Sequence, residues 1–294
     1  MKLTRLFFLS LCLIIYSCSS SKDDLDPSDY QLPDNEEEQN AGDNGTGTGE
    51  ETGGTNETET TTVDGIKIGS NYVVFEPEVT KSDLGLWVVR KKGDPDYYPD
   101  SDNFRTTEGD IAALNDAYLE FTGNNLNGGQ PKSPLKYTFT CPKTAKYRLT
   151  MRMLQPLEKC TPGTEHCTDA GFEKGDKRND LWFKLEGDFT TASAFPTEEL
   201  KKNHKFWGRG VRKWGSIHKM EGHIDGVKKH AVVAVNLKKD EEYTLTISGR
   251  AQGCSIDYII FYERSLEETE NFEVDIHTDL AAALPEYLRP DVAE

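Results

Sequence analysis

Hydrophobic and polar positions alternate over short runs through much of this chain. The clearest case is residues 243–248, where Tyr243, Leu245 and Ile247 alternate with Thr and Ser. This period-two pattern is typical of a half-buried strand. Similar runs, bounded by Gly, Asn and Pro, predict further strands at residues 72–76, 117–121, 137–140, 146–152, 180–185 and 230–235, and in the run that follows Gly253, up to Glu263. Within residues 65–264, only residues 197–202 have the pattern of a short helix.

The many short strands and the Gly/Asn turns between them predict an all-β domain, an antiparallel β-sandwich of jelly-roll type. Strands do not alternate with helices as they do in parallel sheets. We expect the domain to occupy residues 65–264. In the remaining residues 265–294, the run from Asp279 to Leu284, ended by Pro285, indicates a short helix.

The last two predicted strands are joined by a polar turn, residues 248–253, and we expect them to form a hairpin. The turn carries two glycines and one cation, Arg250. In the second strand Asp257 shares a face with Ile259 and Phe261. A carboxylate among strand hydrophobics is costly unless something neutralises it. Asp257 therefore needs a partner from elsewhere in the chain.

The acidity of the chain is concentrated in one segment. The net charge is −17, but residues 23–64 contain 14 acidic residues and no Lys or Arg. Residues 19–64 contain few apolar side chains, which predicts a disordered tether with an r.m.s. reach of about 35–40 Å. The alternative is an acidic surface that binds cations. The rest of the chain has no basic character that would indicate nucleic-acid binding.

The N-terminus has the pattern of a secretion signal, with Lys2 and Arg5 before an apolar run, residues 6–16, that is too short to span a bilayer. The sequence Ile-Tyr-Ser-Cys ending at Cys18 resembles the lipobox of bacterial lipoproteins, although Tyr16 departs from the usual small residue. The resemblance implies removal of residues 1–17 and lipidation of Cys18. The following Ser-Ser-Ser-Lys-Asp-Asp resembles the export signal of Bacteroidetes lipoproteins and implies an outer-membrane lipoprotein exposed at the cell surface. Ordinary cleavage beside a chance cysteine is the alternative.

Four cysteines follow Cys18, and an even number in an exported chain predicts two disulfides. Cys160 and Cys167 flank a Thr/Pro/Gly loop and would pair locally, which leaves Cys141 to pair with Cys254. A zinc site of Cys160, His166 and Cys167 is the alternative, but it lacks a fourth ligand.

Two carboxylates, Glu76 and Glu78, lie on one side of the first predicted strand, separated by Pro77. The first and last strands of a sandwich are commonly neighbours, so Asp257 would converge with this pair. Three hard oxygen ligands suit calcium. Without such an ion, the carboxylates would be solvated positions at a sheet edge.

The order of these motifs resembles the family 6 and family 35 carbohydrate-binding modules and their malectin-like relatives, which have a galactose-binding-like sandwich. Glu76-Pro-Glu78 matches the Glu-x-Glu of their first strand. Residues 256–259, Ile-Asp-Tyr-Ile, match the hydrophobic-Asp-aromatic-hydrophobic element of their last strand. The resemblance covers most of residues 65–264 and implies a structural calcium at Glu76, Glu78 and Asp257. The insertion at residues 155–178 and the segment 188–230 depart from the pattern, so the resemblance does not locate the ligand site.

Aromatic faces hold the C–H surfaces of sugars, helped by a few directed hydrogen bonds. Residues 204–215 contain Trp207 and Trp214 among Gly and cations, which predicts a polar loop with aromatic platforms. Trp214 is the better candidate ligand, although one of the two would alternatively plug the end of the sandwich. The cations of this region would suit an acidic or sulfated glycan: Lys201, Lys202, Lys205, Arg209, Arg212 and Lys213.

The remaining ligand candidates lie in other predicted loops. Arg250 offers a bidentate fork to a hydroxyl, carboxylate or sulfate, or it pairs with Asp180. Asn179 and Asp180 lie at the rim before a strand, and Tyr98 belongs to a group of expected exposed aromatics. Trp182 has strand parity, and we expect it in the core.

We therefore expect a surface lipoprotein that binds polysaccharide without catalysis, in a sandwich stiffened by calcium. Its expected partners are a glycan, the membrane through Cys18, and proteins of a surface uptake system. One alternative is a small jelly-roll lyase or glycoside hydrolase, with His218 as a candidate base. A protein-binding adhesin, or an accessory subunit of a surface complex, is another, because one fold hosts all three functions.

Overall fold

The computed structural model describes residues 61–63, 65–98, 113–211 and 214–263. The predictions for the signal peptide, Cys18, most of the acidic tether and the helix at residues 279–284 lie outside these ranges. Within them, no helix is both long and apolar enough to cross a membrane.

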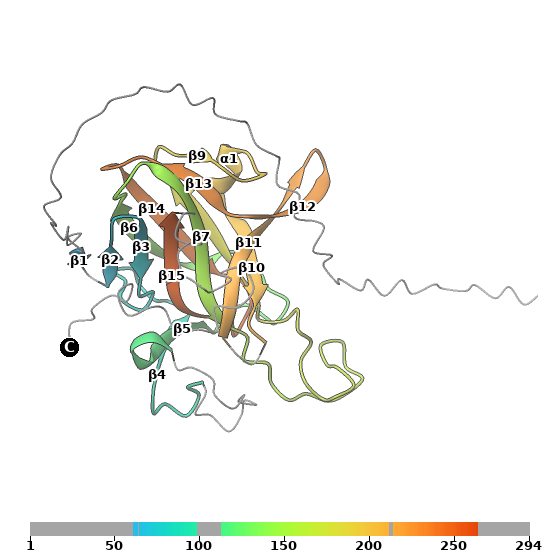
Figure 1. Ribbon diagram of the computed structural model, residues 1–294. Helices are drawn as coiled ribbons and strands as arrows, with labels where there is room; N and C mark the ends of the chain where they lie inside the picture. The colour runs from blue at the N-terminus through green and yellow to red at the C-terminus, as the bar shows by residue number, and fades with distance from the viewer. Residues whose placement is uncertain (1–60, 64, 99–112, 212–213, 264–294) are drawn as a thin grey trace, which may run out of the picture. The chain divides into compact units, whose positions relative to one another are not determined.

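Strands form nearly all of the regular secondary structure among the described residues (Figure 1). The helical elements are the 3₁₀ turn η2 (Leu114–Asp116) and the single-turn helix α1 (Thr197–Leu200). The strands are β1 (Thr61–Val63), β2 (Ile66–Ile68), β3 (Tyr72–Phe75), β4 (Trp87–Lys91), β5 (Ala117–Phe121), β6 (Lys132–Thr140), β7 (Ala145–Leu154), β8 (Asp180–Glu186), β9 (Thr190–Thr191), β10 (His204–Arg209), β11 (Trp214–Ile224), β12 (Val227–Val232), β13 (Ala234–Leu237), β14 (Glu242–Gly249) and β15 (Ser255–Glu263).

The strands pair side by side in the order β1-β2-β3-β15-β7-β11-β10-β8-β14-β6, and each of these pairs is antiparallel. The sheet curls so that its two ends face each other. Phe75 of β3 meets Tyr137 of β6 at a ring distance of 5.7 Å, and Phe139 of β6 meets Phe261 of β15 at 5.1 Å. The described chain is therefore an antiparallel β-sandwich, and the predicted all-β fold class is confirmed.

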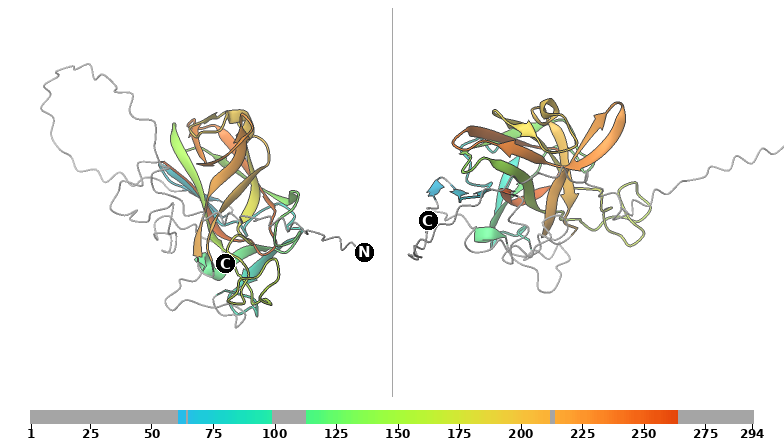
Figure 2. Two further views of the ribbon diagram at one scale, coloured as in Figure 1. Left: turned by 90° about the vertical axis from the view of Figure 1, so that its right-hand side faces the viewer. Right: turned by 45° about the horizontal axis from the view of Figure 1, so that its top comes forward.

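The hydrophobic interior follows from strand parity. In β6, Leu135, Tyr137 and Phe139 are buried, whereas the residues between them are exposed. The buried set meets inward-facing side chains of the opposite layer in one continuous core. Each such large apolar side chain contributes about 1.5–3 kcal/mol when it leaves water. Figure 2 shows the two layers from the side and from above.

The predicted hairpin of residues 243–263 is wrong, although both of its strands exist. β14 pairs with β6 and β8, whereas β15 pairs with β3, β5 and β7. The connecting residues 250–254 therefore cross from one layer of the sandwich to the other. Alternation alone could not distinguish these cases, because a hairpin and a crossover need the same strand pattern.

Residues 204–215, predicted as a loop, form β10 and the start of β11. Phe206 and Gly208 are buried while Trp207 is half-buried and Arg209 exposed, so the segment alternates after all. A β-bulge shifts the pairing register between Trp207 and Gly208. The two strands approach closely there, since a Cβ on Gly208 would lie 1.6 Å from the carbonyl oxygen of Ser216. The predicted strand at residues 230–235 is divided between β12 and β13.

The local disulfide is confirmed, because Cys160 is bonded to Cys167 with a Cα–Cα distance of 5.8 Å. That bond removes both thiolates from the alternative zinc site. The second predicted disulfide is wrong, because Cys141 and Cys254 are both buried free thiols. Cys141 lies beside the beginning of β14 and Cys254 beyond its end, about 25 Å apart for a strand of this length. A disulfide requires Cα atoms within about 7 Å.

Candidate functional site

The outer surface of β8 carries an unexpected tryptophan. Leu181, Phe183 and Leu185 point into the core and are buried, so Asp180 and Trp182 point away from it. Trp182 is half-buried on this outer surface. Its predicted place in the core is therefore wrong, because it shares the parity of the polar residues of β8 and not that of its apolar neighbours.

The pairing of β8 with β10 places two tryptophans on the same face. Lys205 lies directly opposite Trp182, and Trp207 lies opposite Asp180. Residues directly opposite each other in an antiparallel pair point to the same side. These four residues form, with Arg250 from the end of β14, a surface that we call the tryptophan patch.

Arg250 links the patch through one ion pair and one ring contact. Its Nη1 donates a short hydrogen bond to Oδ2 of Asp180, and its guanidinium carbon lies 5.4 Å from the centre of the Trp182 ring. Asp180 is only 3 % exposed, and Lys205 Nζ is 3.5 Å from the same oxygen. A buried carboxylate needs compensating charge, and these two cations supply it to Asp180. The ion pair of Arg250 with Asp180, one of the two predicted roles of Arg250, is therefore confirmed.

The neighbouring loop fixes the other edge of Trp182. Its indole nitrogen donates a hydrogen bond of 2.8 Å to the carbonyl oxygen of Gly129. Gly128 has a φ of +96°, and a Cβ there would lie 2.4 Å from Nη1 of Arg250. Glycine is therefore needed for the loop to lie against the guanidinium. The Trp182 ring and the Arg250 guanidinium are therefore held in place before any ligand binds.

Trp207, on β10, has β8 on one side and a network of charged side chains from β11 and β12 on the other. His230 packs edge-on against its ring with 5.3 Å between centroids, and Lys219 Nζ is 5.8 Å from the ring centre. Glu221 forms ion pairs with Lys205 at 3.4 Å and with Lys228 at 3.0 Å. Burial would raise the pKa of Glu221, but the Lys228 hydrogen bond and the lysine charges hold it below its usual value. Burial lowers the pKa of His230, so this imidazole is neutral at pH 7.

Three polar atoms of the patch have no hydrogen-bond partner among the described residues: Oδ1 of Asp180, Nε1 of Trp207 and Nε of Arg250. Unsatisfied polar groups are uncommon in folded proteins. Asn179, the adjacent rim candidate, is half-buried, and its carbonyl accepts from the Gly208 amide at 3.2 Å. Of the predicted ligand residues, the structure therefore brings together Trp207, Arg250, Asp180 and Asn179.

Trp214 and Tyr98, also predicted as ligand residues, are fully buried, and both predictions are wrong as surface platforms. The Trp214 ring packs on the guanidinium of Arg152 at 4.7 Å and edge-on against Tyr98 at 6.0 Å. Arg152 in turn forms a buried ion pair with Asp257. These aromatics exclude water from that pair, which explains why they lie inside.

The candidate base of the enzyme alternative is also inside. His218 is 9 % exposed, and its Nδ1 lies 2.8 Å from the Ser216 hydroxyl. A general base must reach a proton on its substrate. The described structure gives His218 no such access.

The predicted carboxylate cluster is partly formed. β3 and β15 are paired, with Phe75 opposite Ile259, so Glu76 and Glu78 do lie near the start of the last strand. Oε1 of Glu76 accepts a hydrogen bond of 2.9 Å from the amide of Asn115, while Oε2 of Glu76 and of Glu78 have no partner among the described residues. Burial, and then the charge of Glu78, raise the pKa of Glu76 to about 11. Burial raises the pKa of Glu78 to about 7.

Asp257 lies close enough for its charge to raise the pKa of Glu76 and of Glu78, but its own oxygens have other partners. Its Oδ2 accepts from Nη1 of Arg152 at 2.5 Å, and its Oδ1 accepts from the Leu114 amide at 2.8 Å. Both oxygens are thus used in structural bonds. Within the described ranges, no group of three or more His, Cys, Asp or Glu side chains is arranged to hold a metal. Asp257 instead fixes the turn η2, which carries Asn115 to Glu76.

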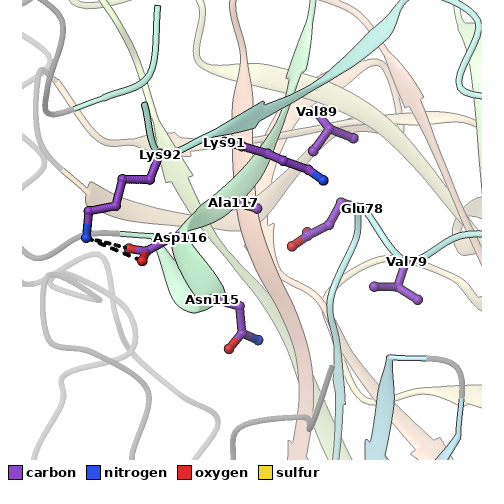
Figure 3. A pocket seen from close by; sticks show the side chains of 8 residues that line it. All are labelled: Glu78, Val79, Val89, Lys91, Lys92, Asn115, Asp116 and Ala117. Atoms are coloured by element: carbon purple, nitrogen blue, oxygen red, sulfur yellow. Dashed lines mark hydrogen bonds and ion pairs between the residues drawn. The ribbon is translucent and has the colours of Figure 1, made fainter. Parts of the chain in front are cut away.

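A pocket of about 590 Å³ lies beside this cluster (Figure 3). Its walls are Glu78 and Val79 from the chain after β3, Val89 and Lys91 of β4 with Lys92 after it, and residues 115–117. The Lys92 ammonium bonds to Asp116 at the pocket rim, at 3.3 Å. The volume is far larger than one ion, so an ion bound there would keep part of its hydration shell.

Sequence reasoning missed Trp182, Glu221, His230 and Asn115. The parity of β8 was a usable signal for Trp182. Glu221 and His230 lie opposite each other in the hairpin of β11 and β12, and Asp225-Gly226 between these strands was a usable signal for that hairpin. For Asn115 the sequence held no local signal, because packing between distant segments brings its turn to Glu76.

Comparison with known proteins gives only distant likenesses. No family model matches the chain, and no curated protein matches it. Among solved structures, the GH26-CBM35 β-(1,4)-mannanase of Podospora anserina has a TM-score of 0.34 at 10 % identity, over 66 % of this chain and 28 % of its own. A family 35 carbohydrate-binding module of Clostridium thermocellum has a TM-score of 0.28 at 11 % identity, over 65 % of this chain and 98 % of its own. An isomalto-dextranase of Arthrobacter globiformis has a TM-score of 0.30 at 9 % identity, over 70 % of this chain and 32 % of its own.

Proposed function

We propose that this chain binds carbohydrate at the tryptophan patch and does no chemistry on it. The observation that carries the proposal is the pair of half-buried tryptophans, Trp182 and Trp207, on neighbouring strands of an outward sheet face. Each tryptophan is outside the hydrophobic core, and the part of its ring that its neighbours leave uncovered is apolar surface in contact with water. Sugars present C–H faces that match such rings, and this supports a glycan as the ligand.

The polar groups between the rings would supply direction. Arg250 and Lys205 provide N–H donors for sugar hydroxyls, and the buried Asp180 carboxyl between them fixes the position of both cations. Because the ion pair and the Gly129 bond already hold these groups, little side-chain entropy is lost on binding. The cations around Trp207 would also favour an acidic or sulfated glycan over a neutral one.

The test is a glycan array, followed by calorimetry with the best ligand, on the wild type and on Trp182→Ala and Trp207→Ala. We expect each variant to lose at least about tenfold in affinity, the range of one stacking contact. Trp214→Phe is the matched control and should bind like the wild type, since that ring is buried. Equal binding by the wild type and both alanine variants would sink the proposal. Release of reducing ends or unsaturated products would instead indicate an enzyme.

Calcium at Glu76 and Glu78 is the second part of the proposal. The two buried carboxyl groups, which lie within hydrogen-bond distance of each other, and the Asn115 amide beside Glu76 fit a hard cation that takes oxygen ligands. Such an ion would neutralise two buried carboxylates and stiffen the start of the sandwich. Asp257 would act through Leu114 and the turn η2, and not as a ligand.

Thermal melts with EDTA and with added calcium test the metal site. We expect calcium to raise the melting temperature of the wild type and to have no effect on Glu78→Gln. Asp83→Asn, an exposed acid nearby, should respond like the wild type. If the melting temperature of the wild type is the same with and without EDTA, the proposed calcium site is wrong.

We also propose that the domain is displayed on the cell surface as an outer-membrane lipoprotein anchored through Cys18, and that it passes glycan to a neighbouring uptake system. The support is the signal-like N-terminus and the acidic segment after it. Metabolic labelling with a fatty acid should mark the wild type and not Cys18→Ser. External protease should remove the domain from intact cells. Wild type without label would rule out the anchor, and a pull-down that retains a protein while the array stays blank would favour an adhesin.

A further inference from the structure

The tryptophan patch lies in the middle of a longer row of outward side chains that crosses five strands. Trp182 of β8 has Ser248 of β14 opposite it on one side and Lys205 of β10 on the other. Lys205 lies opposite Glu221 of β11, and Glu221 lies opposite His230 of β12. Residues directly opposite each other in antiparallel strands point to the same side. These five residues therefore form one continuous line on the outer face, which we call the central row.

A second row lies beside the central row and contains the other tryptophan. Trp207 of β10 has Asp180 of β8 opposite it on one side and Lys219 of β11 on the other. Lys219 in turn lies opposite Val232 of β12. The two indole rings therefore occupy adjacent rows on adjacent strands, and both rows continue past them in the direction that crosses the strands.

A third row lies on the other side of the central row and carries lysines at both ends. Lys136 of β6 and Lys184 of β8 lie on either side of Thr246 of β14. At the far end, His223 of β11 lies opposite Lys228 of β12. The strands involved follow the order β6-β14-β8-β10-β11-β12 (Figure 1). Since neighbouring strands are about 4.8 Å apart, the distance from β6 to β12 is about 24 Å.

The three rows together, which we call the lysine track, are positively charged in a chain whose net charge is −17. They contain two acids and five lysines: Asp180, Glu221, Lys136, Lys184, Lys205, Lys219 and Lys228. Asp180 is buried, and Glu221 is shared between Lys205 and Lys228. At the two ends of the track, Lys136 is exposed and the Lys228 side chain is 53 % exposed. Solvent can therefore reach the cations at both ends.

We propose that the lysine track binds an internal stretch of a linear anionic polysaccharide, which lies across the strands. The inference rests on the proposed function, because the tryptophan patch is the middle of the track. Trp182 and Trp207 hold the sugar rings by stacking. Lysines two strands apart, such as Lys136 and Lys184, are about 10 Å from each other and meet anionic groups that recur along the chain.

Two properties of the ligand follow from this placement. Because the end lysines are exposed, a long chain can continue past either end of the track, and the ligand need not present a chain terminus. A lysine ammonium is a compact charge without the planar fork of an arginine. The track therefore accepts either sulfate or carboxylate groups, and selects for the spacing of charge along the chain.

Calorimetry with oligosaccharides of defined length tests the track. The probes are heparin fragments, which carry sulfates, and oligogalacturonates, which carry carboxylates, each from dimer to octamer. For at least one series, we expect affinity to rise at least about tenfold from dimer to octamer, because only the longer chain reaches the lysines beyond the patch. Raising the salt concentration from about 50 to about 500 mM should remove most of this gain, because salt screens exposed charges.

Two variants remove cations at opposite ends of the track. Lys136→Gln and Lys228→Gln should each weaken octamer binding about two- to fivefold, the range of one exposed ion pair, and leave dimer binding unchanged. Their free-energy costs should add, because the two sites are about 24 Å apart. Lys239→Gln is the matched control, since it removes an exposed lysine outside the three rows, and it should bind the octamer like the wild type.

Equal affinity for dimer and octamer, or no binding of either anionic series, would overturn the track. If a neutral glycan still binds and Trp182→Ala abolishes that binding, the proposed function stands and only the track is wrong. Arg209 is exposed and follows Trp207 along β10. Weaker octamer binding by Arg209→Gln, with wild-type binding by both end variants, would indicate a chain parallel to the strands and would also overturn the track.

Discussion

The buried pair of Arg152 and Asp257 allows a quantitative prediction, because its two members respond differently to the loss of their partner. Both side chains are at most 1 % exposed and are joined at 2.5 Å. Asp257→Asn leaves a guanidinium that cannot lose its proton at any ordinary pH. We expect this variant to cost about 3–5 kcal/mol of unfolding free energy, the usual penalty for a buried unpaired charge.

Arg152→Met leaves the Asp257 carboxylate without its partner, but this group can take up a proton and so lose its buried charge. Burial already raises the pKa of Asp257, and the Arg152 charge opposes this rise. Protonating a carboxyl of ordinary pKa 3.8 costs about 4.4 kcal/mol at pH 7 and about 1.4 less for each pH unit lower. In this variant the folded pKa lies above the unfolded one, so stability falls as pH rises between the two values. The penalty of Arg152→Met should therefore be about 1.6 kcal/mol at pH 5. Asp257→Asn has no such escape, because its guanidinium stays charged at both pH values.

Urea unfolding of both variants and of the double variant, at about pH 5 and pH 7, measures these values. The double variant should be more stable than Asp257→Asn alone, because no charge remains buried. Lys143→Met is the control, since its ion pair with Glu263 is exposed and should be worth less than about 1 kcal/mol. Identical pH profiles for the two single variants would refute the reasoning.

Three other changes have defined outcomes. Gly208→Ala should cost at least about 3 kcal/mol of unfolding free energy in urea, because its Cβ would overlap a carbonyl of β11. The control Gly175→Ala makes only ordinary contacts and should cost less than about 1 kcal/mol. Similar costs for the two variants would contradict the close approach of β10 and β11. Lowering the pH from about 7.5 to 5 charges His230, whose folded pKa is below the usual value. Stability should therefore fall over this range while affinity for an anionic glycan rises. If His230→Gln shows the same pH response as the wild type, another group causes it. Alkylation without reductant should modify Cys141 and Cys254 only after denaturation, because both thiols are buried, and failure to modify them then would restore the predicted disulfide.

The sequence predicted individual strands well and their neighbours poorly. The range 117–121 matches β5, and residues 180–185 lie within β8, because alternation of apolar and polar side chains is a local property. The partners of β14 and β15 depend on which layer each strand joins. That choice is made by packing between segments far apart in the chain, as between Phe139 and Phe261.

The candidate site shows the same division. Arg250 with Asp180 was within reach of the sequence, since both lie at strand ends beside turns. Trp214 and Trp182 were assigned to each other's environments, the first predicted on the surface and the second inside. Composition around Trp214 suggested a polar loop, but the bulge after Trp207 and the buried Arg152 decide its direction. Neither feature has a signature in the local sequence.

The position of β7 has a mechanical consequence. Along the strand order, β7 joins β15 on one side to β11 on the other, and thereby connects the layer of β3 to the layer of β8 through backbone hydrogen bonds (Figure 1). A pulling force applied between a ligand on the tryptophan patch and the chain before β3 would cross this strand. Its ladder with β15 spans residues 147–154, so resistance to force should be set there, and shortening β7 should weaken the domain under tension more than it lowers its melting temperature.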